Sequence, residues 1–86
     1  MSYRIIVGRS AERRSLRRRI LPERAGQIRE AINALAENPR PGNSRQLRDR
    51  PARRLRVGDY RIIYDVDDDR REVFVAEVWH RQRGYR

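Results

Sequence analysis

Apolar and polar side chains alternate along residues 53–64, in two short segments separated by Gly58 and Asp59. This alternation predicts two half-buried β-strands, and Gly-Asp suits the two-residue turn of a tight hairpin. Such a turn pairs Val57 with Tyr60, Arg56 with Arg61 and Leu55 with Ile62. The face predicted to be buried comprises Leu55, Val57, Tyr60, Ile62 and Tyr64, and the other face comprises Arg54, Arg56, Arg61 and Ile63.

The segments before this hairpin predict one strand and two helices. Residues 3–7 alternate as a short strand, and Ser10 is a plausible N-cap for a helix over about residues 11–19. A second helix is predicted over residues 22–37, ending before Pro39 because proline disfavours helical geometry in the residue before it. Its apolar residues recur at spacings of three, four and three, which predicts a stripe packed against the core. They are Ala25, Ile28, Ile32 and Leu35.

The remaining segments complete a sheet. Residues 44–47 predict a brief edge strand, residues 67–71 a polar turn, and residues 72–79 the final strand. Antiparallel pairing around that turn sets Phe74 opposite Tyr64, Ala76 opposite Ile62, Val78 opposite Tyr60 and Glu77 opposite Arg61. In this register the outer face of the final strand carries Val75, Glu77, Trp79 and Arg81. The order is β-α-α-β-β-β with an extra short edge strand, a single α+β domain over residues 1–86. Its two helices cover one face of a mainly antiparallel sheet.

The composition of the chain indicates a negatively charged binding partner. The chain has 86 residues, a net charge of +10 and 40% charged residues, and all 22 basic residues are arginine. Guanidinium groups bind phosphate in a bidentate manner and keep their charge, so the balance favours RNA, DNA or an acidic protein. The absence of cysteine excludes disulfides and thiolate metal sites. No signal peptide or membrane span is apparent, so we expect a cytoplasmic protein that does not insert into a membrane.

The arginine face of the hairpin limits the chemistry. Like charges directly opposite each other destabilise a sheet, which suggests an anion to receive them. Positioned guanidiniums can hold a phosphate and stabilise the extra charge of its transition state, and no metal is needed. Arginine is a poor acid or base, so proton transfer requires other groups. The candidates near the predicted site are His80, Tyr85, Asp59 and Glu77.

Each candidate has a simpler structural interpretation. A lone histidine at a strand end is often structural, Tyr85 is the penultimate residue, and Glu77 can neutralise Arg61. Trp79 can stack on a base, pack under a partner or cap the core. Asp67, Asp68 and Asp69 are interpreted as a loop, because a metal site needs more ligands at defined spacing. We therefore expect no metal and no cofactor.

One run of residues resembles a known family. Residues 54–64 read Arg-Leu-Arg-Val-Gly-Asp-Tyr-Arg-Ile-Ile-Tyr, followed by an acidic turn, an apolar strand ending in His80-Arg81, and a nearby tyrosine. This arrangement resembles the RelE/ParE superfamily of bacterial toxins, with the closer match on the RelE side. The resemblance implies a ribosome-dependent endoribonuclease that cuts mRNA through the 2′-hydroxyl without metal. It also implies a cognate antitoxin, and binding of the toxin–antitoxin complex to operator DNA through that antitoxin.

The resemblance also assigns roles to residues. Arg54 and Arg56 fall on phosphate-binding positions, whereas the catalytic set implied by the resemblance comprises Arg61, Arg81, His80 and Tyr85. Some family members carry lysines on the first hairpin strand, where this chain has Ala52 and Arg54. Two alternatives stay open: a ParE-like poison of DNA gyrase, and an RNA-binding module without catalysis, since a shared fold does not decide function.

Overall fold

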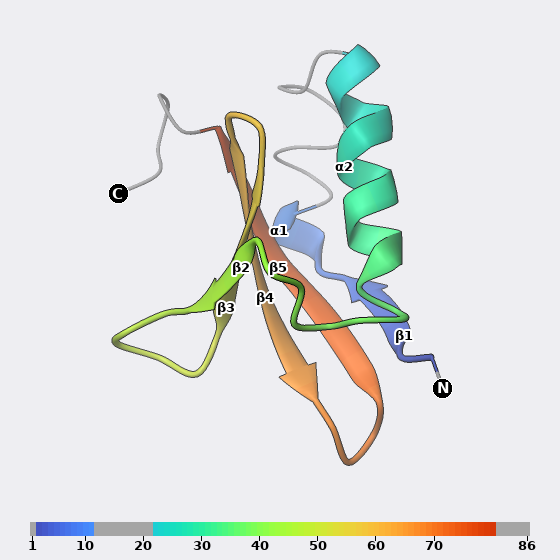
Figure 1. The fold of residues 1–86 in the computed structure, drawn as a ribbon, viewed down its shortest axis with the longest axis vertical. Coiled ribbons are helices and arrows are strands. Elements are labelled where there is room, and N and C mark those ends of the chain that lie inside the picture. The colour runs from blue at the N-terminus through green and yellow to red at the C-terminus, as the bar shows by residue number, and fades with distance from the viewer. Residues whose placement is uncertain (1, 12–21, 81–86) are drawn as a thin grey trace.

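The computed structural model describes residues 2–11 and 22–80 of the chain, and in this part a helix packs against a five-stranded sheet (Figure 1). The helices are α1 (Arg9–Ala11) and α2 (Pro22–Ala34). The strands are β1 (Arg4–Val7), β2 (Ser44–Gln46), β3 (Arg53–Val57), β4 (Tyr60–Asp67) and β5 (Glu72–His80). The predicted α+β fold, its element order and the short edge strand are confirmed.

The sheet is mixed, with the strand order β1-β5-β4-β3-β2. The pairs β2–β3, β3–β4 and β4–β5 are antiparallel, whereas β1 runs parallel to β5. The edges are therefore β1 on one side and the three-residue β2 on the other. Among the described residues, no helix is long and apolar enough to cross a membrane.

Both predicted helices differ from expectation at their ends. The first begins at Arg9, so Ser10 lies inside α1 and is not its N-cap; the rest of that predicted helix lies outside the described residues. The second ends at Ala34 instead of residue 37. The Ala34 carbonyl accepts from the amides of Glu37 at 3.2 Å and Asn38 at 3.1 Å, so the chain leaves α2 through a tight turn before the proline.

The core lies between α2 and the inner face of the sheet. Ile28, Ile32 and Leu35 of the predicted stripe are buried, and Ala25 is half-buried. The three buried residues belong to a cluster with sheet residues, namely Leu55, Tyr60, Ile62, Tyr64, Val73, Val75 and Val78, and with Ala11 of α1. Burial of one such large side chain stabilises the fold by about 1.5–3 kcal/mol.

The β3–β4 hairpin has the predicted register throughout. Val57 pairs with Tyr60, Arg56 with Arg61 and Leu55 with Ile62. Gly58 has a φ of 57°, the left-handed conformation that glycine adopts without steric cost. The two-residue turn therefore sets the pairing of the whole hairpin.

The predicted register between β4 and β5 is wrong. Val78 pairs with Ile62 and Val75 with Tyr64, with an irregularity between Ile63 and Tyr64 that leaves Ala76 as an extra residue in β5. Such a bulge exchanges the two faces of the strand beyond it. Val75 is consequently buried instead of exposed, and Phe74 is 42% exposed instead of buried.

The turn after β4 is held by Asp68. Its carboxylate accepts a hydrogen bond from the Tyr3 hydroxyl at 2.7 Å and a bidentate pair from Arg40 at 2.9 and 3.2 Å. The hydrogen bond from Arg40, and then that from Tyr3, lowers the pKa of Asp68 below its ordinary value. This turn is the predicted polar turn, and Asp68 connects it to the N-terminal strand and to the loop after α2.

Candidate functional site

Two rows of outward-facing residues cross the hairpin end of the sheet. Paired residues of neighbouring strands point to the same face, so the register defines each row. The first row is Arg45, Arg54, Ile63 and Glu77, from β2 to β5. The second row is Arg56, Arg61 and Trp79, from β3 to β5. We call this surface the arginine face.

Two like-charged pairs lie next to each other on the arginine face. Arg45 is opposite Arg54, and Arg56 is opposite Arg61. A like-charged pair at such a position opposes sheet formation by roughly 0.2–1 kcal/mol. An anion bound over the four guanidiniums would relieve both repulsions.

Arg61 is more buried than the sequence suggested. Only 7% of its surface is exposed, and its Nη1 donates to the carbonyl oxygens of Gly58 at 3.1 Å and Tyr60 at 3.0 Å. The guanidinium is therefore part of the hairpin turn as well as of the arginine face. These bonds fix where its positive charge lies.

Arg54 and Arg56, the predicted phosphate-binding residues, are nearer the solvent. Arg54 is half-buried and Arg56 is exposed. The main chain of Arg56 is fixed by Asn43, whose carbonyl accepts from the Arg56 amide at 3.2 Å and whose Nδ2 donates to the Arg56 carbonyl at 2.9 Å. A rigid main chain thus presents a side chain that solvent or a ligand can reach.

Glu77 and Trp79 form a hydrogen-bonded pair on β5. Trp79 Nε1 donates to Glu77 Oε1 at 2.5 Å. The predicted placement of Glu77 opposite Arg61 is wrong, since Trp79 occupies that position and Glu77 faces Ile63. The hydrogen bond orients the indole within the second row, next to Arg61. Both residues also line a pocket of about 180 Å³, together with Ser10 and Val78.

His80 lies on the other face of the sheet. It pairs with Tyr60, whose side chain belongs to the core, and the two rings meet edge to face with centroids 5.1 Å apart. The sheet therefore separates His80 from Arg54, Arg56 and Arg61. Arg81 and Tyr85, the remaining predicted catalytic residues, lie outside the described residues.

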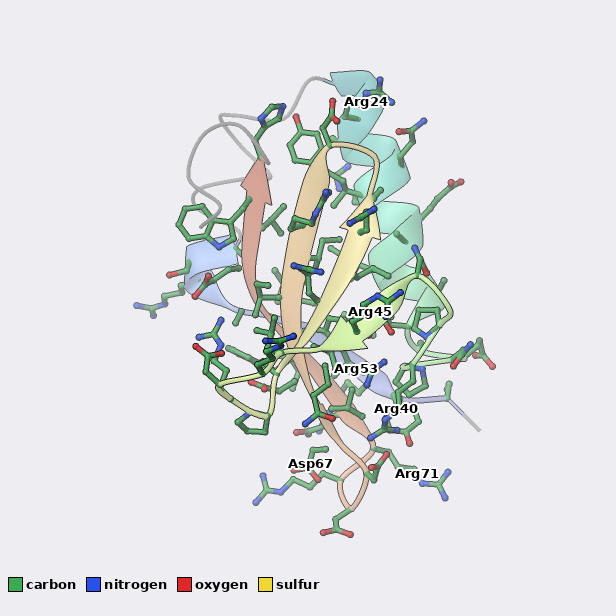
Figure 2. All side chains as sticks on the ribbon, turned by 60° about the vertical axis from the view of Figure 1, so that its left-hand side comes forward. Arg24, Arg40, Arg45, Arg53, Asp67 and Arg71 are labelled. Atoms are coloured by element: carbon green, nitrogen blue, oxygen red, sulfur yellow. The ribbon has the colours of Figure 1, made fainter. Side chains whose placement is uncertain are left out.

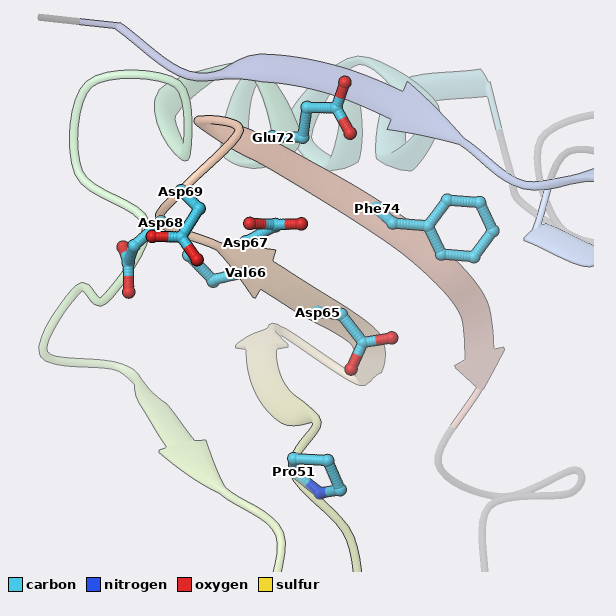
Figure 3. A pocket seen from close by; sticks show the side chains of 8 residues that line it. All are labelled: Pro51, Asp65, Val66, Asp67, Asp68, Asp69, Glu72 and Phe74. Carbon is cyan, nitrogen blue, oxygen red and sulfur yellow. The ribbon is translucent and has the colours of Figure 1, made fainter.

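An acidic pocket of about 640 Å³ occupies the opposite end of the outer face (Figure 3). It is lined by Pro51, Asp65, Val66, Asp67, Asp68, Asp69, Glu72 and Phe74. Within the described ranges, no group of three or more potential ligands is arranged to hold a metal ion. The carboxylates repel a polyanion, so this end of the outer face favours one less than the arginine face does.

Arg45 and Arg48 were missed by the sequence-based selection of site residues. With Gln46, Leu47 and Arg54 they line a pocket of about 700 Å³ at the β2 edge. The edge strand itself was predicted, but its register was not. That register is what brings Arg45 next to Arg54.

The fold is that of the RelE toxins. The toxin–antitoxin complex RelBE2 from Mycobacterium tuberculosis contains a chain with 27% identity and a TM-score of 0.79, and the match covers 94% of this chain and 100% of that one. An archaeal RelE–RelB complex from Pyrococcus horikoshii gives 22% identity and a TM-score of 0.83, covering 98% and 100% of the two chains. The E. coli RelBE complex gives 24% identity and a TM-score of 0.79, covering 99% and 100%. The last two show the fold alone.

The sequence model for the ParE toxin of the type II toxin–antitoxin system parDE matches residues 10–85, and the chain therefore belongs to this toxin family. A search of curated proteins found no match. The resemblance to the RelE/ParE superfamily is confirmed, while the family model carries the ParE name and the structural neighbours are RelE. The chain is a type II toxin of the RelE/ParE superfamily.

Proposed function

We propose that this toxin is a ribosome-dependent endoribonuclease that inhibits translation by cutting mRNA. The observation that carries the proposal is the pair of arginine rows on one face of the sheet. Such a face suits the phosphodiester backbone of single-stranded RNA, because guanidinium binds phosphate in a bidentate manner and retains its charge. Sequence specificity and the positioning of the codon would come from the ribosome.

The reaction is attack of a ribose 2′-oxygen on the adjacent phosphorus. A 2′,3′-cyclic phosphate forms, the bond to the 5′-oxygen breaks, and one proton leaves the 2′-hydroxyl while another reaches the departing oxygen. Arg54 and Arg56 would hold the phosphate, and Arg61 would stabilise the developing negative charge. No metal takes part in the proposed reaction.

Proton transfer is assigned to the C-terminal end of β5. Of the proposed catalytic set, His80 and Tyr85 are assigned the proton transfer because arginine cannot lose its proton, and Arg81 would add positive charge. Because His80 is the last residue of β5 and faces the core side, the RNA must reach around the strand end to meet it. A catalytic contact of this kind can form only in the substrate complex, so its absence from the unbound protein is compatible with the role.

The proposed partner that restrains the toxin is a cognate antitoxin. The M. tuberculosis neighbour is a toxin–antitoxin complex, and the net charge of +10 favours an acidic partner. The bound antitoxin would cover the arginine face until it is removed. The toxin–antitoxin complex would bind operator DNA through the antitoxin.

The decisive test maps mRNA 5′ ends after induced expression. We expect cuts at defined codon positions with 5′-hydroxyl ends, and we expect Arg56→Ala and Arg81→Ala to abolish them. Arg29→Ala is the matched control, because Arg29 is an exposed arginine on α2, away from the arginine face. Intact mRNA in cells that stop growing would refute the proposed activity.

The role of His80 has its own test. If His80 carries a proton, His80→Gln should slow cleavage on the order of 10²-fold. The rate is measured with purified ribosomes, and a circular dichroism melt confirms that loss of the Tyr60 contact leaves the variant folded. An unchanged rate would assign the proton transfer to Tyr85 or to a group of the ribosome.

A ParE-like poison of DNA gyrase is the second candidate, and the match to the ParE family model favours it. The separation of His80 from the arginines by the sheet also fits a toxin without nuclease chemistry. Purified toxin added to gyrase and plasmid DNA distinguishes the two: trapped cleavage complexes support poisoning, whereas normal supercoiling excludes it. A non-catalytic RNA-binding module would show neither mRNA cuts nor gyrase inhibition.

A further inference from the structure

Arg45 is one of several exposed arginines in the described region whose side chains make no hydrogen bond or ion pair, and it is the one that lies on the sheet edge opposite Arg54. Arg4 pairs with Glu72 at 2.8 Å, and Arg40 pairs with Asp68 at 2.9 Å. Within the described residues, no hydrogen bond or ion pair engages the side chain of Arg45, which is exposed on β2 (Figure 2). An unpaired guanidinium placed opposite Arg54 calls for an explanation, because the pairing is unfavourable without a shared anion.

The position of Arg45 extends the arginine face to the sheet edge. Neighbouring strands are about 4.8 Å apart, and a two-residue step along a strand is about 6.7 Å. Arg54 is one such step from Arg56 on β3, and Arg45 is one strand beyond Arg54. The backbone positions that carry these guanidiniums are therefore spaced at intervals similar to the separation of consecutive phosphates in an extended single strand.

The space next to Arg45 can accept a bound polymer that extends from the arginine face past the edge of the sheet. The pocket of about 700 Å³ at this edge is lined by Arg45, Gln46, Leu47, Arg48 and Arg54. β2 is the edge strand of the sheet, so among the described residues no further strand closes this side. Asp49, which follows Arg48 in the chain, is exposed and is not among the lining residues.

The lining favours a nucleic acid over a protein segment. Leu47 is its one apolar side chain, and three of the five lining residues are arginine. Protein interfaces derive most of their affinity from apolar and aromatic anchors in desolvated pockets, whereas nucleic-acid interfaces are polar and strongly positive. The chemistry of this pocket matches a phosphodiester.

We infer that Arg45, assisted by Arg48, forms an additional phosphate subsite for single-stranded RNA, next to the phosphate held by Arg54 and Arg56. This inference rests on the proposed RNA-cleaving function and names a contact away from the reacting phosphate. Arg45 is therefore a positioning residue. It holds the RNA backbone in register and touches none of the reacting atoms.

The test measures RNA binding by the full-length protein at a series of salt concentrations. The probe is a fluorescein-labelled 12-nucleotide uridine oligomer with 2′-O-methyl groups, which cannot be cleaved by 2′-attack. We expect Arg45→Gln to weaken binding on the order of tenfold, as for one charge-assisted hydrogen bond. We also expect it to reduce the slope of log affinity against log salt by about 0.7, the value for one single-strand phosphate contact.

Controls separate this subsite from general electrostatics. Arg29→Gln removes an equal charge from α2 and should leave the slope unchanged, and Arg45→Lys should restore it. With a dinucleotide probe, too short to span both subsites, Arg45→Gln should have no effect while Arg56→Ala still weakens binding. A melting temperature equal to that of the wild type verifies that each variant is folded.

The outcomes distinguish this inference from the proposed function. If Arg56→Ala weakens RNA binding and Arg45→Gln does not, the subsite is refuted and the nuclease proposal stands. If neither variant changes RNA binding, the proposed function fails along with the subsite. If Arg45→Gln weakens binding of a polyglutamate peptide but not of RNA, the pocket recognises an acidic protein and the inference is overturned.

Discussion

Replacing Arg61 with alanine should destabilise the fold as well as the proposed chemistry. Arg61 is 7% exposed, and its Nη1 donates to the carbonyls of Gly58 and Tyr60 at 3.1 and 3.0 Å. A hydrogen bond that involves a charged group contributes about 1.5–3 kcal/mol. Because a single nitrogen serves both carbonyls, the loss is less than twice this value.

The repulsion between Arg61 and Arg56 acts in the other direction. Its removal returns roughly 0.2–1 kcal/mol, so we expect a net loss of about 2–3 kcal/mol in the free energy of unfolding. For a domain of this size each kcal/mol lowers Tm by roughly 4–8 °C, and the expected decrease is therefore on the order of 10–20 °C.

The assay is thermal unfolding followed by circular dichroism, with Arg56→Ala as the matched control. Arg56 is exposed and takes part in the same repulsive pair, so its replacement should leave stability unchanged or raise it by at most about 1 kcal/mol. If Arg61→Ala melts with the wild type, or if Arg56→Ala melts as early as Arg61→Ala, the hydrogen bonds of Arg61 do not hold the turn. Activity of Arg61→Ala must accordingly be compared below its melting range.

Two further predictions concern stability. In Gly8→Ala the new methyl carbon would lie 2.7 Å from the ring of Phe74. This clash should lower the free energy of unfolding, measured in urea, by about 1–3 kcal/mol. Gly26→Ala in α2, with nothing within 4 Å, should instead stabilise by about 1 kcal/mol, and equal effects would contradict the packing. Because Arg40 lowers the pKa of Asp68, the stabilisation from this carboxylate is present above the unfolded pKa of about 3.9 and lost as pH falls through the lower folded value. Asp68→Asn should therefore flatten the acid side of the stability–pH curve, and Asp69→Asn should leave it unchanged.

The hairpin shows what local sequence can predict. Its register depends on a two-residue turn between alternating strands, so a short stretch of chain contains all the necessary information. The core stripe of α2 is equally local, because helical spacing alone brings Ile28 and Ile32 to one side, and Leu35 follows directly after the helix. The three hairpin arginines of the candidate site followed from the same alternation.

The β4–β5 pairing shows where local information ends. The longer turn allows several registers, and the bulge at Ala76 exchanges the faces of the residues beyond it. Burial of Val75 and exposure of Phe74 follow from this one irregularity. The bulge depends on packing against the rest of the sheet, and the sequence of a short segment does not contain that information.

The sequence by itself determined the elements of this toxin, the hairpin register and a surface that carries arginines, because turn chemistry and side-chain periodicity act over a few residues. The tertiary structure alone decided how those charges are used. It buried Arg61 against its own turn, set Arg45 opposite Arg54, and put the sheet between His80 and the arginines. These relations depend on which strands become neighbours and in what register, and such long-range pairing is a property of the whole fold.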